Sequence, residues 1–146
     1  MPALEPVERK SMKVVFDAGV VFSGAGWRGE AHRCLLAMAH RRVIAYATEE
    51  TLKELSNLLA DRGDRAKHPP ATTLSWYQDN VKHIEPAPLG KQRSRDVKDD
   101  PYLACALGAG AKIIVTRDGD LLVLGKPFGI QIITPRELLV RLSRPL

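Results

Sequence analysis

The chain has 146 residues, of which 45% are hydrophobic and 27% charged, and its formal net charge is +5. These values are typical of one globular domain with a buried core and argue against a disordered chain. No apolar run is long enough to cross a membrane or to act as a secretory signal, so we expect a cytoplasmic protein without a membrane partner.

The N-terminal stretch MPALEPVERKS is polar and contains proline, so we expect residues 1–11 to form a disordered leader and residues 12–146 to form a single domain. Cys34 and Cys105 lie in apolar helical patterns, which favours buried free thiols over a disulfide. The histidines show none of the spacings typical of a zinc site.

The first half of the chain alternates apolar runs with helical patterns. A β-branched run at 13–16 and the run VIAYA at 43–47 predict two buried strands. Apolar residues at a spacing of three and four predict a helix over 30–40. Thr48 is placed to cap a further helix that continues to Leu59.

The second half repeats this alternation. We expect a helix from residue 72 or 73 to 81, a loop over 85–95, a helix led by Asp99 or Asp100 that continues to 107, strands at 112–115 and 130–133, and a closing helix over 135–142. Strands that alternate with helices at this spacing predict a parallel sheet with helices on both faces. In such sheets the functional groups collect beyond the carboxyl ends of the strands.

The segment Gly24–Gly29 spells G-x-G-x-x-G, the spacing of a dinucleotide-binding turn. A nucleotide-binding domain would need residues 20–22 to end a strand. Trp27 and Arg28 are bulky for a segment that must approach a pyrophosphate, and this interpretation gives Asp17 no role. We therefore interpret the glycines as a flexible turn between a strand and a helix, and keep nucleotide binding as a third hypothesis.

Acidic residues stand just past predicted strands or in the helices that follow them: Asp17; Glu54; Asp96, Asp99 and Asp100; and Asp118 and Asp120. Each acid alone fits a turn, a helix N-terminus or a solvated surface. Together they should meet at one edge of a parallel sheet. Two unit charges about 4 Å apart repel by roughly 4 kcal/mol at an effective dielectric near 20, so such a cluster needs a divalent cation. Oxygen ligands without histidine or thiolate favour Mg²⁺ or Mn²⁺.

A carboxylate-held metal site favours chemistry on phosphate esters, since a bound ion polarises a phosphate and activates water. Basic residues crowd a stretch flanked by proline and glycine, namely Lys91, Arg93, Arg95 and Lys98. They suit contacts with RNA phosphates, although an ordinary solvated loop would look the same.

Four segments of the chain resemble PIN-domain ribonucleases, especially the toxin-like bacterial branch related to the VapC toxins: VVFDAGVVFSG, TEETLKEL, RDVKDDPYLACAL and IIVTRDGDLL. The resemblance implies a three-layer α/β/α sandwich on a parallel sheet. It also implies Mg²⁺- or Mn²⁺-dependent cleavage of RNA by the toxin of a toxin–antitoxin pair. An antitoxin protein and a second copy of the chain are the partners that it suggests.

By resemblance, the catalytic, metal-binding acids are Asp17, Glu54, Asp100 and Asp118. Asp99 and Asp120 are the neighbours that could take their places, and Ser23 and Thr116 match small hydroxyl positions that support the acids.

The chain departs from the family pattern directly after its first acid. Ala18 and Gly19 stand where the family usually has Thr and Asn. Losing such supporting residues commonly costs about 10–100-fold in metal affinity or activity. The alternative function is therefore a catalytically weak or inactive PIN-like module that binds RNA or protein.

Overall fold

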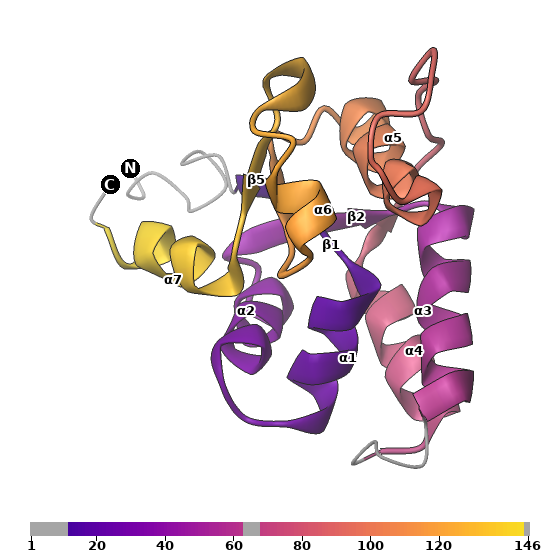
Figure 1. The fold of residues 1–146 in the computed structure, drawn as a ribbon. Coiled ribbons are helices and arrows are strands. Elements are labelled where there is room, and N and C mark those ends of the chain that lie inside the picture. Colours follow the sequence, from indigo (N-terminus) through magenta and orange to yellow (C-terminus); the bar gives the residue numbers. More distant parts are fainter. Residues whose placement is uncertain (1–11, 63–67, 145–146) are drawn as a thin grey trace, which may run out of the picture.

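A computed structural model of the chain describes residues 12–62 and 68–144 (Figure 1). Within these residues, five parallel strands form one sheet in the order β3-β2-β1-β4-β5. The strands are β1 (Met12–Phe16), β2 (Val43–Ala47), β3 (Lys82–His83), β4 (Ile113–Val115) and β5 (Gln131–Ile133). The predicted leader at 1–11 lies outside the described residues.

Helices cover both faces of the sheet (Figure 1). On one face lie α1 (Ala18–Gly26), α2 (Glu30–Ala39), α3 (Glu49–Arg62), α4 (Pro70–Asn80) and α7 (Pro135–Ser143). On the other lie α5 (Asp100–Ala109) and α6 (Gly119–Leu122). Two short 3₁₀ turns, η3 (Val97–Asp99) and η4 (Pro127–Gly129), precede α5 and β5. The predicted three-layer α/β/α sandwich is confirmed.

The buried core has two parts because successive side chains of a strand point to opposite faces. In β1, Val14 and Phe16 pack with the helices of one face, whereas Val15 packs against the other. Leu55 of α3 and Leu103 of α5 are fully buried on their respective faces. Both faces of the strands are thus covered, which explains their nearly continuous apolar sequences.

The strands and helices predicted from apolar periodicity are confirmed, with small shifts at their ends. Thr48 precedes α3 as expected, and its hydroxyl accepts a hydrogen bond from the backbone N–H of Thr51 at 3.2 Å. The fourth helix begins at Pro70 rather than at residue 72 or 73, because proline is favoured in the first turn of a helix. Both cysteines are free and buried, as predicted.

The interpretation of the glycines at 24–29 as a turn between a strand and a helix was wrong in part. Residues 20–26 belong to the helix α1, and only residues 27–29 connect it to α2. A Cβ atom at Gly24 would lie 2.8 Å from the carbonyl oxygen of Ala31 and 2.7 Å from Cδ1 of Leu35. Gly24 therefore lets α1 and α2 approach closely, and the strand that a dinucleotide-binding turn requires is absent from this described segment.

None of the helices in residues 12–62 and 68–144 combines the length and apolar character needed to cross a membrane.

Candidate functional site

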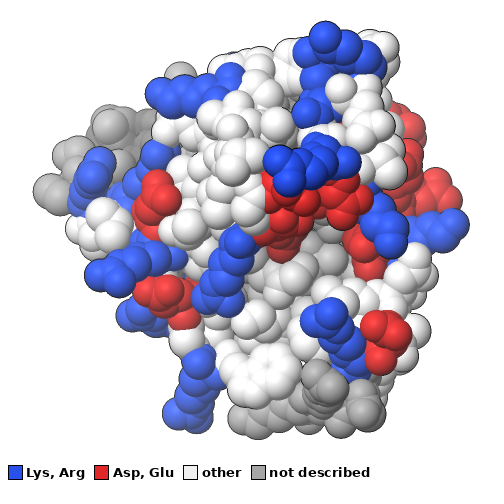
Figure 2. All heavy atoms as spheres, viewed as in Figure 1, with Lys and Arg blue, Asp and Glu red and all other residues white. Residues whose placement is uncertain are grey.

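An open pocket of about 300 Å³ lies where β1 and β4 end. Five acids line it: Asp17, Glu54, Asp96, Asp99 and Asp118. Two basic residues, Lys98 and Arg117, line it as well. Figure 2 shows acidic side chains gathered at one place on this face of the molecule, with Lys and Arg side chains around them.

Asp17 is held in place from two sides. It follows β1 and caps α1, because its Oδ1 accepts a hydrogen bond from the backbone N–H of Val20 at 2.8 Å. Its Oδ2 accepts a hydrogen bond from the hydroxyl of Thr116, a fully buried residue directly after β4. Since β1 and β4 are paired, the two strand ends place these residues side by side. Burial raises the pKa of Asp17, and the nearby charge of Asp118 adds to the rise.

The residues after Asp17 provide different support from the Thr and Asn of the family pattern. The hydroxyl oxygen of Tyr102 accepts a hydrogen bond from the backbone N–H of Ala18 at 3.1 Å. A Cβ atom at Gly19 would lie only 3.3 Å from Oδ1 of Asp17, so the absence of a side chain there leaves space for this carboxylate. Thr116 supplies the hydroxyl contact from the neighbouring strand.

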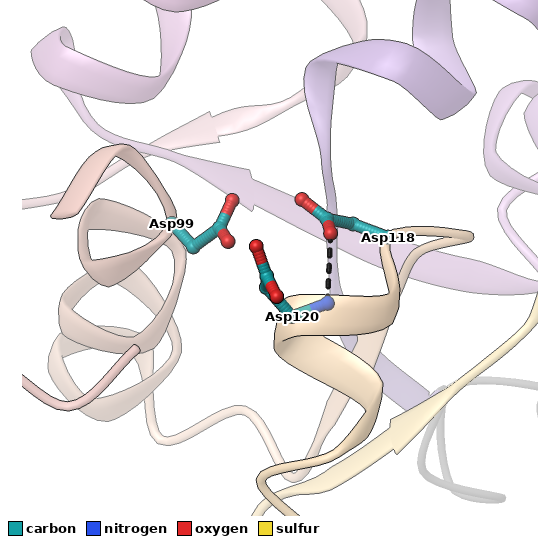
Figure 3. A group of neighbouring side chains, drawn as sticks. All are labelled: Asp99, Asp118 and Asp120. Carbon is teal, nitrogen blue, oxygen red and sulfur yellow. Dashed lines mark hydrogen bonds between the residues drawn. The ribbon is translucent and has the colours of Figure 1, made fainter. Parts of the chain in front are cut away.

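Asp99, Asp118 and Asp120 point toward one another (Figure 3). A carboxylate oxygen from each lies within 4.8 Å of one from each of the others. Asp118 also caps α6, with its Oδ1 accepting a hydrogen bond from the backbone N–H of Asp120 at 2.9 Å. Burial and the charge of Asp118 raise the pKa of Asp99 to about 7. A divalent cation would offset the repulsion within this group.

The structure does not bring Asp100 together with Asp17, Glu54 and Asp118. Its Oδ1 accepts a hydrogen bond from the backbone N–H of Ser94 at 2.7 Å, and its Oδ2 accepts one from Arg93 at 2.8 Å. The Asp100 carboxylate thus fastens the preceding loop and lines a neighbouring pocket. Asp99, which the sequence offered as its replacement, takes the position in the acidic pocket.

The predicted RNA-binding residues have different surroundings. Lys98 lines the acidic pocket, and Lys91 and Arg95 are exposed. The guanidinium of Arg93 instead stacks 4.8 Å from the ring centre of Phe128 and donates a hydrogen bond to the Leu89 carbonyl at 3.0 Å. These contacts give Arg93 a structural role in its loop.

Three residues that line the pocket or contact its acids were not indicated by the sequence pattern: Ser94, Tyr102 and Arg117. The hydroxyl of Ser94 contacts Asp99, and Arg117 donates a hydrogen bond to Ser23. The position of Arg117 between Thr116 and Asp118 is a signal that could have drawn attention to it. Nothing local in the sequence singles out Ser94, because its contacts depend on how its loop returns to α5.

The donor set fits a hard divalent cation. The side chains that gather in the pocket offer carboxylate oxygens, and no histidine or cysteine lines it among the described residues. Such oxygen ligands suit Mg²⁺ or Mn²⁺ and disfavour zinc.

A parallel α/β sandwich with carboxylates gathered at the carboxyl ends of its strands is the class of protein that this fold and site define. A family model described as a PIN domain matches residues 13–120. The chain belongs to the PIN-domain family. PIN domains are generally nucleases, and they typically use divalent metal ions.

A similar fold occurs in the crystal structure of PAE2754 from Pyrobaculum aerophilum. The two chains share 22% sequence identity with a TM-score of 0.65, and the match covers 92% of this chain and 97% of that one. A search of the curated proteins returned no match.

Proposed function

We propose that this protein is a metal-dependent endoribonuclease whose cation is held by Asp17, Asp99 and Asp118, with Glu54 and Asp120 beside them. The observation that carries the proposal is the convergence of acids from β1, α3, the start of α5 and the end of β4 on one pocket. In this proposal Asp99 replaces Asp100 as the third acid, because Asp99 lines the pocket whereas the Asp100 carboxylate bonds the backbone of the preceding loop and lines a neighbouring pocket.

The residues of the pocket have separate roles in binding and in orientation. Val20 and Thr116 hold Asp17, and Ser94 holds Asp99, so both carboxylates are fixed before substrate binds. When bound, Mg²⁺ or Mn²⁺ supplies Lewis-acid polarisation of the scissile phosphate and a nucleophile derived from water. Lys98 adds positive charge at the rim, which favours the approach of a polyanion.

The test is cleavage of a labelled single-stranded RNA by purified protein with Mn²⁺ or Mg²⁺. Asp17→Asn and Asp99→Asn should abolish cleavage, whereas Asp79→Asn should leave it unchanged. Asp79 is an exposed residue of α4 and provides the same change of charge away from the pocket. Equal cleavage by all four proteins would indicate a contaminating nuclease and reject the assignment.

The toxin role is a further part of the proposal and rests on the resemblance to VapC-like chains. Induced expression in a bacterial host should arrest growth, and Asp99→Asn should relieve the arrest. An antitoxin would then be expected to cover the acidic pocket with a basic or polar side chain. Unimpaired growth with the wild-type protein, together with cleavage in vitro, would support the nuclease function and reject the toxin role.

Homodimer formation stays a prediction, and light scattering of the purified protein would test it.

The second candidate is a PIN-like module that binds RNA or protein without cutting RNA. The observation that favours it is Ala18-Gly19 after Asp17, where the family usually has Thr and Asn. Calorimetry separates the two functions, since the module would bind RNA but show no heat of Mn²⁺ binding at millimolar concentration.

A further inference from the structure

Arg117 is a basic residue at the acidic pocket whose side chain is bonded to a neutral partner. It stands directly after Thr116, and its Nη1 donates a hydrogen bond to the hydroxyl of Ser23 in α1 at 3.3 Å. Within the described residues, no ion pair joins Arg117 to an acid of the pocket. Its charge is therefore available to a ligand, although it lies beside several carboxylates.

The contact with Ser23 places the guanidinium to one side of the carboxylate group. Ser23 stands six residues after Asp17 in the sequence, within the helix that Asp17 caps. At 1.5 Å per residue this separation is roughly 9 Å along the helix axis. Burial raises the pKa of Cys34 in α2, and the positive charge of Arg117 partly offsets this rise, which indicates that Arg117 also lies near α2. The guanidinium thus lies near α1 and α2, beside the acids of the pocket.

A guanidinium in this position has the donors that a phosphate diester requires. Arginine carries five N–H donors in a planar fork, and one nitrogen of Arg117 is engaged by Ser23. The remaining donors can bind two oxygens of one phosphate at once. The hydroxyl of Ser23 reduces the freedom of the side chain, which lowers the entropic cost of that binding.

We propose that Arg117, oriented by Ser23, binds the backbone phosphate of single-stranded RNA that lies next to the scissile phosphate. The inference rests on the proposed nuclease function and adds a substrate-binding position to it. The pocket then has two ends: carboxylates that hold the cation at one, and a guanidinium that holds the strand at the other.

This arrangement predicts a particular kinetic signature. A phosphate that does not react contacts Arg117 equally in the ground state and in the transition state, so its loss raises KM and leaves kcat nearly unchanged. A hydrogen bond to a charged group corresponds to about a tenfold change in binding. We expect Arg117→Ala to raise KM about tenfold while kcat stays within about threefold.

Lys112 provides the matched control. It precedes β4, whereas Arg117 follows the same strand, so the two residues lie at opposite ends of the sheet. Lys112→Ala removes the same charge and should leave KM unchanged. Arg117→Lys keeps the charge but lacks the planar guanidinium with its paired N–H donors. Ser23→Ala removes the hydrogen bond that orients the guanidinium. Both variants should therefore raise KM less than Arg117→Ala does. Thermal unfolding of each variant shows whether the fold is retained.

A binding measurement separates this inference from the nuclease function. In an Asp99→Asn background with Mg²⁺, fluorescence anisotropy of a labelled single-stranded RNA reports affinity without cleavage. Arg117→Ala should weaken binding about tenfold and reduce the slope of log affinity against log salt by about 0.7. No cleavage by the wild-type protein, together with Arg117-dependent binding, would reject the nuclease and keep this RNA contact.

Three outcomes would overturn the inference. Arg117→Ala could match Lys112→Ala in both KM and RNA affinity. Its kcat could fall with KM unchanged, which would place Arg117 at the reacting phosphate. The Asp99→Asn protein could show no RNA binding with Arg117 present.

Discussion

The hydroxyl of Ser94 donates a hydrogen bond to Oδ2 of Asp99 at 3.1 Å. The backbone N–H of the same residue donates to Oδ1 of Asp100 at 2.7 Å. One buried residue therefore directs two successive carboxylates to different places. Asp99 lies with Asp118 in the acidic pocket, and Asp100 fastens the loop before α5.

Replacing Ser94 with alanine removes the hydroxyl contact with Asp99 but keeps the backbone contact with Asp100. We expect the affinity for Mn²⁺ to fall by about 10–100-fold, because outer contacts fix the orientation of ligand carboxylates. Calorimetric titration of the purified variant measures this. Ser75→Ala, at an exposed position of α4, is the control. Equal Mn²⁺ affinity of the two variants would show that Ser94 does not orient Asp99.

Asp99 and Asp100 should respond differently to the same substitution. Asp100→Asn keeps one acceptor oxygen where two backbone N–H groups now donate, so the free energy of unfolding should fall by about 1–3 kcal/mol. Its affinity for Mn²⁺ should stay close to that of the wild type. Asp99→Asn should lose Mn²⁺ binding and keep its stability, because it removes a charge that Asp118 repels. Chemical denaturation and calorimetry on both variants check this pair, and the reverse pattern would restore Asp100 as the third acid.

The stability of the metal-free protein should depend on the pH through these acids. Burial, with the charge of Asp118, raises the pKa of Asp99 from 3.8 to about 7, and it also raises the pKa of Asp17. Between the unfolded and folded pKa values the native state binds more protons than the unfolded state, so this contribution to stability decreases as the pH rises. It is fully present below about pH 4 and lost once the pH passes about 7 for Asp99.

The variant Asp99→Asn isolates this effect because asparagine does not titrate. In EDTA, the unfolding free energy of the wild type should decrease relative to that of Asp99→Asn between pH 5 and pH 8. Adding Mn²⁺ should stabilise the wild type more at pH 8 than at pH 5, since ligand carboxylates bind the ion only when deprotonated. A constant difference between the two proteins from pH 5 to pH 8 would contradict the raised pKa of Asp99.

The sequence predicted the sheet and the meeting of its acids because both follow from regular patterns. Short β-branched runs such as Val14-Val15-Phe16 are typical of buried parallel strands, and parallel strands end at a common edge. The choice between Asp99 and Asp100 could not be made in this way. It depends on how the loop at 92–95 folds back on α5, where Ser94 bonds Asp99 through its hydroxyl and Asp100 through its backbone N–H. Contacts set by the conformation of a loop leave no periodic pattern in the sequence.

The helix α1 was not predicted from the sequence, for a related reason. Its sequence AGVVFSGAG is rich in β-branched residues and glycine, which disfavour helices by local propensity. The helix forms because Asp17 caps its first turn and because Val20 and Val21 are buried in the core. Packing and capping therefore outweigh propensity here, as they often do when a helix is enclosed by tertiary contacts.

The role of Gly24 in the contact between α1 and α2 gives a prediction in which propensity and packing oppose each other. Alanine is favoured over glycine inside a helix by about 1 kcal/mol. At position 24, however, the added Cβ would lie 2.8 Å from the backbone oxygen of Ala31, which cannot move aside as a side chain could. Overpacking of this kind costs about 1–3 kcal/mol, so we expect Gly24→Ala to lower the free energy of unfolding.

Gly26 is the matched position, because a Cβ there meets no atom within 4 Å. Gly26→Ala should leave the thermal unfolding temperature unchanged or raise it, whereas Gly24→Ala should lower it by about 2–4 °C for each kcal/mol lost. Gly24→Ala should also weaken Mn²⁺ binding, because Asp17 caps the helix that the substitution displaces. Equal effects of the two substitutions on the unfolding temperature would mean that α1 and α2 do not approach as closely as the structure places them.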